Sequence, residues 1–421
     1  MGSSIYDLKV MINPVKSTQK PSFLSRPEAE KVLNFHQTIA SYQPTPLLAL
    51  NELAKKLGVE RIYVKDESHR FGLNAFKALG GTYAMAKMIC KILQLPDECL
   101  DFNYLSSPEI KQKSGQLTFV TATDGNHGRG VAWSAAMLGQ KAVVYLPKGT
   151  AKARVDAILE TGSEAVVTDV NYDQTVRLAM QQAKENRWYL VQDSAWVGYT
   201  EVPSWVMQGY MTMVYETMNQ LKENGWPWPT HIFLQAGVGS MPAAVLGMLV
   251  NCPETETIKP IIVEPHNAAC IYYSAACNDG NRHAVTGDLQ TIMAGLACGE
   301  PNLIAWDILR DFSYAFVSLE DFFASRGVRI LGHSAGGDPG IISGESGAVG
   351  VGLLSLAMEK PELYPVKKAL GFDHSSRVLV LNTEGDTDPE NYRDIVWDGK
   401  YPLPFARELT YHLDRTVRGS S

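Results

Sequence analysis

Lys77 ends a segment that could keep a side-chain amine away from bulk water. It closes residues 70–77 (RFGLNAFK), with Phe76 just before it and a glycine pair at 80–81. A lysine amine forms a Schiff base with a carbonyl group most readily when it is not a hydrated ammonium, and an apolar neighbour favours that state. A lysine near a helix start is nevertheless more often a solvated surface charge. The segment becomes informative only beside the other motifs.

A second candidate is the loop of residues 123–128 (TDGNHG), which follows a β-prone run and precedes a helical pattern. Free backbone N–H groups at such a helix N-terminus bind anions, so Thr123, Asp124 and Gly125 are candidates for holding a carboxylate. Asn126 could donate a hydrogen bond to the phenolic oxygen of a cofactor ring. The alternative is a simple turn in which Asp124 or Asn126 caps the helix.

A third candidate is the glycine turn of residues 236–240 (AGVGS), again between a strand and a helix. The backbone amides of Gly237, Val238, Gly239 and Ser240 could cradle a phosphate group. The turn also resembles a dinucleotide fingerprint, because Glu264 ends the next strand. The third glycine of that fingerprint is missing, however, so the motif favours a single phosphate over NAD.

Three further positions stand at the ends or starts of expected elements. Asn382 and Thr383 end a fully apolar strand, where a hydroxyl could meet a ring nitrogen; the alternative is a turn. Glu345 opens an apparent helix and could simply cap it. Asp193 follows a strand, where functional residues of such sheets often lie, although an exposed loop carboxylate is the commoner outcome.

The elements that must position these residues alternate between strand and helix. Strands are expected at residues 119–123, 141–146, 165–168, 188–192, 232–235, 261–263 and 377–381. This alternation predicts parallel sheets with right-handed crossovers. We expect two doubly wound, three-layer α/β domains with the ligand in the cleft between them. The larger domain would comprise residues 1–81 and 201–421, and the smaller one residues 82–200.

Composition excludes several classes of function. A chain of 421 residues with a net charge of −7 and no basic block is not expected to bind nucleic acid or anionic membranes. No apolar stretch is long enough to span a membrane, and the N-terminus lacks a signal-peptide core. Six cysteines without a CxxC pair indicate reduced thiols and a cytoplasmic protein with no predicted metal site, although Cys270 and Cys298 could pair.

Taken in this order, the motifs resemble those of fold type II pyridoxal 5'-phosphate (PLP) enzymes, the group of tryptophan synthase β and the threonine and serine dehydratases. A more specific similarity, over roughly residues 35–400, is to the diaminopropionate ammonia-lyase family. It is carried by residues 42–47, 65–68, 123–130, 171–173, 192–193, 294–301, 343–350 and 383–388.

The resemblance implies a reaction and a cofactor. Members of the family convert D- and L-2,3-diaminopropionate to pyruvate and two ammonia, with PLP held on the residue that matches Lys77. It implies that Gly237–Ser240 hold the phosphate, that Asn126 contacts the ring oxygen, and that Thr383 or Asn382 contacts the ring nitrogen. Tyr172 and Glu345 lie in matching segments and are counted with the substrate-binding residues. A homodimer is implied as well.

The two carboxylates have separate expected roles. Dehydratases of the group usually carry a small hydroxyl residue where this chain has Asp124. A carboxylate there could pair with a second substrate ammonium or act as the base for the D isomer, while Lys77 serves the L isomer. Asp193 matches a family carboxylate that helps hold the distal amine.

One departure and three alternatives remain. Asn382 stands where the family often has a serine, which leaves the partner of the ring nitrogen open. The nearest alternative is a serine or threonine dehydratase, against which Asp124 argues because a hydroxyl leaving group gives no reason for that charge. A nucleotide-binding dehydrogenase and a catalytically inactive amino-acid-binding protein are the alternatives from other classes.

Overall fold

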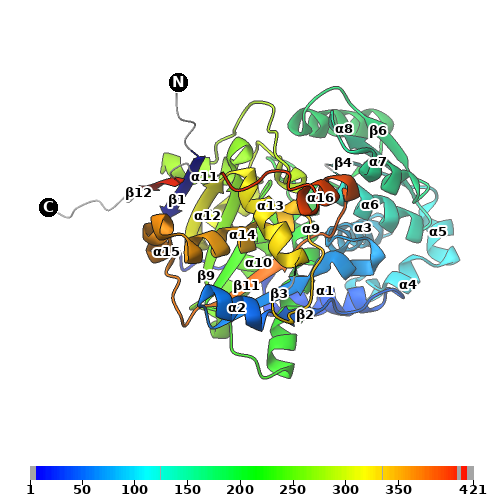
Figure 1. Ribbon diagram of the computed structural model, residues 1–421. Coiled ribbons are helices and arrows are strands. Elements are labelled where there is room, and N and C mark those ends of the chain that lie inside the picture. Colours follow the sequence, from blue (N-terminus) through cyan, green and yellow to red (C-terminus); the bar gives the residue numbers. More distant parts are fainter. Residues whose placement is uncertain (1–5, 124, 334, 405–408, 415–421) are drawn as a thin grey trace.

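The structure, a computed structural model, describes residues 6–123, 125–333, 335–404 and 409–414 (Figure 1). Two sheets organise it, one of eight strands and one of four. In Figure 1 the smaller sheet and its helices, coloured cyan to green, form a lobe beside the larger sheet. Within the described residues no helix combines the length and apolar character that a membrane span requires.

The larger sheet has the strand order β12-β1-β10-β9-β8-β11-β3-β2. Its central strands are parallel, whereas β1 is antiparallel to β10 and β2 is antiparallel to β3. The strands are β1 (Tyr6–Ile12), β2 (Leu47–Ala49), β3 (Arg61–Asp66), β8 (His231–Gln235), β9 (Lys259–Pro265), β10 (Ala315–Leu319), β11 (Arg377–Asn382) and β12 (Leu409–Asp414). Because β8 and β11 are parallel neighbours, the glycine turn after β8 lies beside residues 383–384.

The smaller sheet is entirely parallel, in the order β6-β5-β4-β7. Its strands are β4 (Thr118–Ala122), β5 (Lys141–Leu146), β6 (Glu164–Val167) and β7 (Tyr189–Leu190). Helices α6 (Asn126–Met137), α7 (Lys152–Leu159) and α8 (Tyr172–Asn186) connect them. Since β4 and β7 are neighbours, the loop after β4 and Asp193 after β7 emerge at the same edge.

Helices cover both faces of the larger sheet and make it the middle of three layers. Along β8, Ile232 and Leu234 join one hydrophobic core, while Phe233 between them joins the other. This alternation is the two-residue period of a strand buried on both sides. The helices are α1 (Arg26–Gln37), α2 (Asn51–Leu57), α9 (Glu201–Glu223), α10 (Ser240–Val250), α11 (Cys270–Cys277), α12 (Leu303–Phe312), α13 (Asp321–Gly332), α14 (Glu345–Glu359), α15 (Tyr364–Leu370) and α16 (Pro389–Val396).

Helix α3 (Ala78–Ile92) begins directly after Lys77 and packs closely on both α9 and α6. A Cβ added at Gly80 would lie 2.5 Å from the Tyr210 ring of α9, and one at Gly130 of α6 would lie 2.8 Å from the Ala78 nitrogen. Glycine at these positions therefore allows the approach that fixes the start of α3. Two short helices, α4 (Phe102–Leu105) and α5 (Pro108–Ser114), follow it.

The predicted fold class is confirmed, with two differences in detail. Every strand listed from the sequence is present, shifted at its ends by no more than three residues. Five strands of the larger sheet were not predicted: β1, β2, β3, β10 and β12. Three of them, β1, β3 and β10, lie inside the sheet, and β2 and β12 form its edges. The domain boundaries at residues 81–82 and 200–201 stay a prediction; α3 crosses the first of them.

Candidate active site

Lys77 and Asp193 form a buried ion pair at the centre of the candidate site. The Lys77 amine donates to Asp193 Oδ2 at 2.6 Å, and their side chains are 15% and 3% exposed. The amine also lies 5.5 Å from the ring centre of Phe76 and 5.9 Å from that of Tyr210. These aromatic walls limit hydration of the amine, as a Schiff-base lysine requires.

Asp193 is fixed by contacts from three directions. The Tyr172 hydroxyl, at the start of α8, donates to Asp193 Oδ1 at 3.4 Å and accepts from Gln192 Nε2 at 2.9 Å. The Asp193 carbonyl oxygen accepts from Ser240 Oγ at 2.5 Å and from Asn302 Nδ2 at 2.7 Å. Ser240, at the end of the glycine turn of the larger sheet, is thereby hydrogen-bonded to the backbone of Asp193 in the smaller lobe.

The Asp193 carboxyl is held in its charged form. Burial alone would raise its pKa, but the Lys77 ammonium and then His127 outweigh burial and bring the pKa down to about 2. Beside the Lys77 ammonium, Asp193 is therefore an anion at neutral pH, and it favours a cationic nitrogen next to it.

The glycine turn after β8 has the features of an anion site. Gly239 has φ +97°, a left-handed conformation that favours glycine, and it precedes α10. Among the described residues, no acceptor takes the backbone N–H groups of Gly237, Val238 or Gly239. A Cβ at Gly237 would lie 3.0 Å from the Gly295 carbonyl oxygen, a close contact. Any larger residue would therefore have to push residue 295 aside. These amides at a helix N-terminus suit a phosphate.

The loop after β4 turns sharply before α6. Gly125 has φ +143°, and its N–H donates to Thr123 Oγ1 at 2.9 Å, so Thr123 shapes the loop. Asn126 Nδ2 donates to Glu384 Oε2 at 2.5 Å and lines the same pocket as Lys77. Asp124, the proposed base for the D isomer, lies outside the described residues, and its role stays a prediction.

Of the two candidates for the ring nitrogen, Thr383 lines the pocket. Its Oγ1 accepts from Gln235 Nε2 at 2.9 Å, which leaves the hydroxyl proton for another acceptor. The Asn382 amide instead donates to Asp66 Oδ1 at 2.7 Å and to the Ile342 carbonyl oxygen. The side chain of Asn382 thus binds β11 to its neighbours, and Thr383 is the residue that we assign to the cofactor.

Glu345 lies further out than the sequence suggested. It is 4% exposed at the start of α14, its Oε1 accepts from Asn391 Nδ2, and it lines an outer cavity of about 630 Å³ that shares Tyr172 with the inner pocket. Burial, and then the nearby charge of Glu384, raise the pKa of Glu345 to about 7. Ser346, the next residue, lines the inner pocket instead.

Three polar residues of the site were not singled out from the sequence. Gln235 ends β8 inside an apolar run, Asn302 caps α12 through Ile304 and Ala305, and Glu384 follows Thr383. Only Asn302 carried a usable signal, since Asn before a helical pattern is a common cap. The contacts of the other two depend on segments far apart in the chain.

The dinucleotide alternative fails at Glu264. This carboxylate would have to reach a ribose, but it is fully buried and accepts from the backbone N–H groups of Ile271 and Tyr272 at 2.8 and 2.6 Å. Glu264 therefore anchors the start of α11. Cys270 and Cys298, whose pairing the sequence left open, are not joined by a disulfide.

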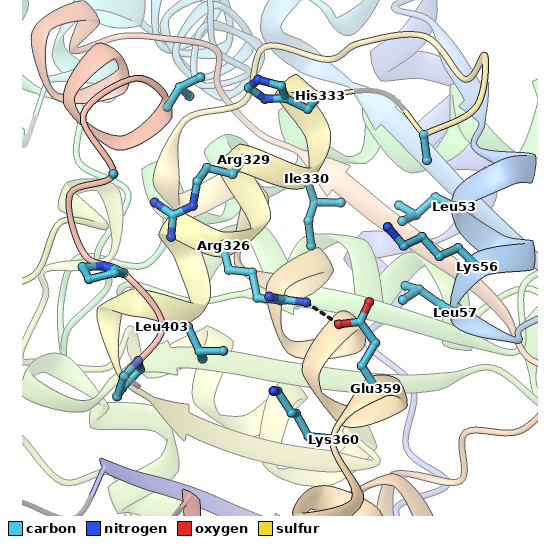
Figure 2. A pocket seen from close by; sticks show the side chains of 15 residues that line it. Leu53, Lys56, Leu57, Arg326, Arg329, Ile330, His333, Glu359, Lys360 and Leu403 are labelled. Atoms are coloured by element: carbon cyan, nitrogen blue, oxygen red, sulfur yellow. Dashed lines mark hydrogen bonds and ion pairs between the residues drawn. The ribbon is translucent and has the colours of Figure 1, made fainter. Parts of the chain in front are cut away.

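A separate cavity of about 760 Å³ lies between α2, α13 and the C-terminal end of α14 (Figure 2). Arg326 and Glu359 pair across it, with Lys56 and Lys360 nearby. It contains none of the candidate site residues. We therefore place the chemistry at Lys77.

The hydrogen-bond donors of the pocket around Lys77 match the chemical groups of PLP. Gly237, Val238 and Gly239 offer free backbone amides for a phosphate, Asn126 offers an amide for a ring oxygen, and Thr383 a hydroxyl for a ring nitrogen. Lys77 lines the same pocket and would form the Schiff base with the carbonyl group of the cofactor. These groups come from both sheets, so the cofactor would bind between them.

Comparisons with known proteins agree with this reading. The model of a family described as "Pyridoxal-phosphate dependent enzyme" matches residues 40–370. The diaminopropionate ammonia-lyase of Escherichia coli (strain K12) is 50% identical over 95% of this chain and 99% of its own length. Its crystal structure with D-serine has a TM-score of 0.88 and 48% identity, covering 94% of this chain and 99% of that one. The structure with an aminoacrylate-PLP azomethine intermediate has a TM-score of 0.87, with 48% identity over 95% of this chain and all of that one.

The chain therefore belongs to the family of pyridoxal-phosphate-dependent enzymes. Within that family it is a carbon–nitrogen lyase of the diaminopropionate ammonia-lyase type, which confirms the resemblance seen in the motifs. The predicted cofactor, PLP, is confirmed in the same way.

Proposed function

We propose that the protein catalyses PLP-dependent α,β-elimination, converting D- and L-2,3-diaminopropionate to pyruvate and two ammonia. The observation that carries the proposal is the Lys77–Asp193 pair at 2.6 Å in a pocket with free phosphate-binding amides. When bound, PLP supplies an electron sink for the carbanion that forms at the substrate Cα.

Lys77 and Asp193 act as a pair. Asp193 holds the Lys77 nitrogen at the pocket wall, and Lys77, once released by substrate, is the base that removes the Cα proton of the L isomer. Asp193 then remains as an anion that helps hold the distal amine of the substrate. We assign to Asp124 the removal of the Cα proton from the opposite face, which is the face that the D isomer presents.

The leaving amine must be charged when its bond breaks. The electron pair of the C–N bond goes to nitrogen, so a protonated amine departs as neutral ammonia, whereas an unprotonated amine would have to leave as an amide anion. The anionic Asp193 favours the ammonium form of an amine in the pocket. Tyr172 keeps Asp193 in place through Oδ1.

We also propose a homodimer in the cytoplasm as the working form. A serine or threonine dehydratase is the alternative within the family, and an inactive amino-acid-binding protein is the alternative outside it. The intact Lys77–Asp193 pair argues against the inactive protein.

The deciding experiment follows pyruvate and ammonia from the purified holoenzyme with D- and L-2,3-diaminopropionate, L-serine and L-threonine. We expect pyruvate from both diamino isomers, with two ammonia per pyruvate. Product from serine or threonine alone would refute the proposal. The Asp124→Asn variant should lose the D isomer selectively, and equal loss of both isomers would reduce Asp124 to a binding group.

A further inference from the structure

Glu384 carries a carboxylate oxygen without a partner inside the active-site pocket. The residue is 2% exposed and lines the pocket together with Lys77 and Asn126. Its Oε2 accepts from Asn126 Nδ2 at 2.5 Å and from Thr387 Oγ1 at 3.0 Å. Its Oε1 is buried and has no hydrogen-bond partner among the described residues. A buried acceptor left unsatisfied is costly, so this oxygen is placed to meet a donor that arrives with a ligand.

The backbone fixes Glu384 beside the reactive lysine. Residues 383–385 run antiparallel to residues 74–76, with the Phe76 N–H donating to the Thr383 carbonyl oxygen at 3.2 Å and a bridge between Ala75 and Glu384. A Cβ at Gly344 would lie 2.7 Å from Glu384 Cγ, so glycine there makes room for the side chain. Glu384 is thus held by the segment that ends in Lys77.

The charge around Glu384 favours a cation. Glu345, also buried, is close enough that the charge of Glu384, after burial itself, raises its pKa. Arg154 also lies near Glu345 and lowers its pKa, and Arg154 Nη2 donates to Thr387 Oγ1 at 3.2 Å. The two buried carboxyl groups disfavour each other's charged form, and an incoming ammonium would relieve that repulsion.

We propose that Glu384 Oε1 accepts a hydrogen bond from the second ammonium of the substrate, and that Glu384 thereby selects diamino acids over hydroxy amino acids. This inference rests on the proposed function. An ammonium offers three N–H donors and no acceptor, which matches an unpaired carboxylate oxygen. Asp193 differs, because Lys77 and Tyr172 already donate to its two oxygens. Both carboxylates line the same pocket, and Glu384 supplies the acceptor that is not yet occupied.

Glu384 has a second contact that a test must separate from substrate binding. Its Oε2 takes one of the two Asn126 N–H groups and so orients that amide. A purely orienting role would affect every amino acid equally. A role at the second ammonium affects only substrates that have one.

The test compares wild type with Glu384→Gln, which keeps the size of the side chain and an acceptor for Asn126 but removes the charge. Bound PLP is quantified first. Turnover of D- and L-2,3-diaminopropionate is then measured, and D-serine, which lacks the second ammonium, is titrated into the holoenzyme and followed by its visible spectrum. We expect kcat/KM for diaminopropionate to fall by roughly 10- to 100-fold, mainly through a higher KM, because one charge-assisted hydrogen bond is lost. The dissociation constant of D-serine should change by less than about 3-fold.

Two controls keep the outcome decisive. Asp386→Asn removes a carboxylate two residues away that pairs with Asn74 outside the pocket, and it should leave the preference for diaminopropionate over D-serine unchanged. Glu384→Asp keeps the charge and should retain that preference even if PLP binding weakens. Equal weakening of both ligands in Glu384→Gln, or an unchanged kcat/KM, would overturn the inference. Failure of wild type to release pyruvate from diaminopropionate would instead refute the proposed function.

Discussion

Among the residues that the structure describes, two lysine–carboxylate pairs are buried, and one of them lines a pocket. Lys77 donates to Asp193 at 2.6 Å and Lys65, on β3, donates to Glu216, on α9, at 2.7 Å. The Lys65 side chain has no exposed surface, whereas that of Lys77 is 15% exposed. The two pairs have almost the same length, so the length of an ion pair does not identify the reactive lysine.

The Lys65 pair belongs to a closed network. Its ammonium donates to Glu216, to the Thr45 carbonyl oxygen and to Gln220 Oε1, which uses all three of its N–H groups. Arg70 completes the network by donating to Glu216 and Glu67. Two cations thus face two anions, and no donor remains for a ligand.

The Lys77 pair stands where several loops meet. Asn126, Thr383 and the glycine turn line the same pocket, each with a donor available to a bound group. A buried ion pair is therefore structural when neighbouring residues use all of its hydrogen-bonding groups. It can serve as a reaction centre when the surrounding residues keep donors available for a ligand.

The largest expected effect is on catalysis by Lys77→Ala. We expect kcat/KM for both diaminopropionate isomers to fall by at least about 10³-fold, since the variant loses both the covalent anchor and the base. The thermal midpoint should fall less than in a Lys65 variant, because water can enter the pocket beside Asp193. Retention of wild-type activity would contradict the assignment.

Lys65→Met should lower stability strongly and leave catalytic activity nearly unchanged, the opposite of what we expect for Lys77→Ala. Removing one partner leaves Glu216 buried with an unbalanced charge, so the free energy of unfolding should drop by roughly 3 to 5 kcal/mol. Denaturant unfolding measures the loss, and the folded fraction should keep its activity within about 3-fold. A decrease of less than about 1 kcal/mol in the free energy of unfolding would show that water or another residue compensates the charge of Glu216.

Asp193→Asn tests the pH dependence of the open pair in the apoenzyme. The Asp193 pKa is depressed to about 2 in the folded state, so its contribution to stability is present above the unfolded value and is lost as pH falls toward 2. Wild type should exceed the variant by about 2 kcal/mol near neutral pH, and the gap should close between about pH 4 and pH 2. A gap that stays constant across that range would show that the Lys77 contact does not depend on the Asp193 charge.

The smallest effect is expected for Tyr42→Phe, which sharpens the description of the closed network. The Tyr42 hydroxyl donates to Glu216 Oε1 at 2.8 Å, and Arg70 still donates to the same oxygen in its absence. The free energy of unfolding should fall by about 1 kcal/mol without any change in kcat. A change in substrate affinity would show that the two pairs are coupled.

The sequence revealed the motifs better than it revealed their partners. Strand and helix alternation predicted the layers, and the glycine turns at residues 123–128 and 236–240 indicated two of the loops whose residues line the pocket, because both patterns depend on local residue types. The ion-pair partners of Lys77 and Lys65 were beyond it, since their carboxylates lie 116 and 151 residues away. Glu384 was missed for the same reason, because its contact to Asn126 spans 258 residues.

Borohydride reduction of the PLP-loaded enzyme, followed by mass spectrometry of its peptides, tests the central claim most directly. Reduction converts a Schiff base into a stable amine on the lysine that formed it. We predict that the phosphopyridoxyl group is found on the peptide containing Lys77. Its recovery on Lys65, or on any lysine outside the pocket, would contradict the account.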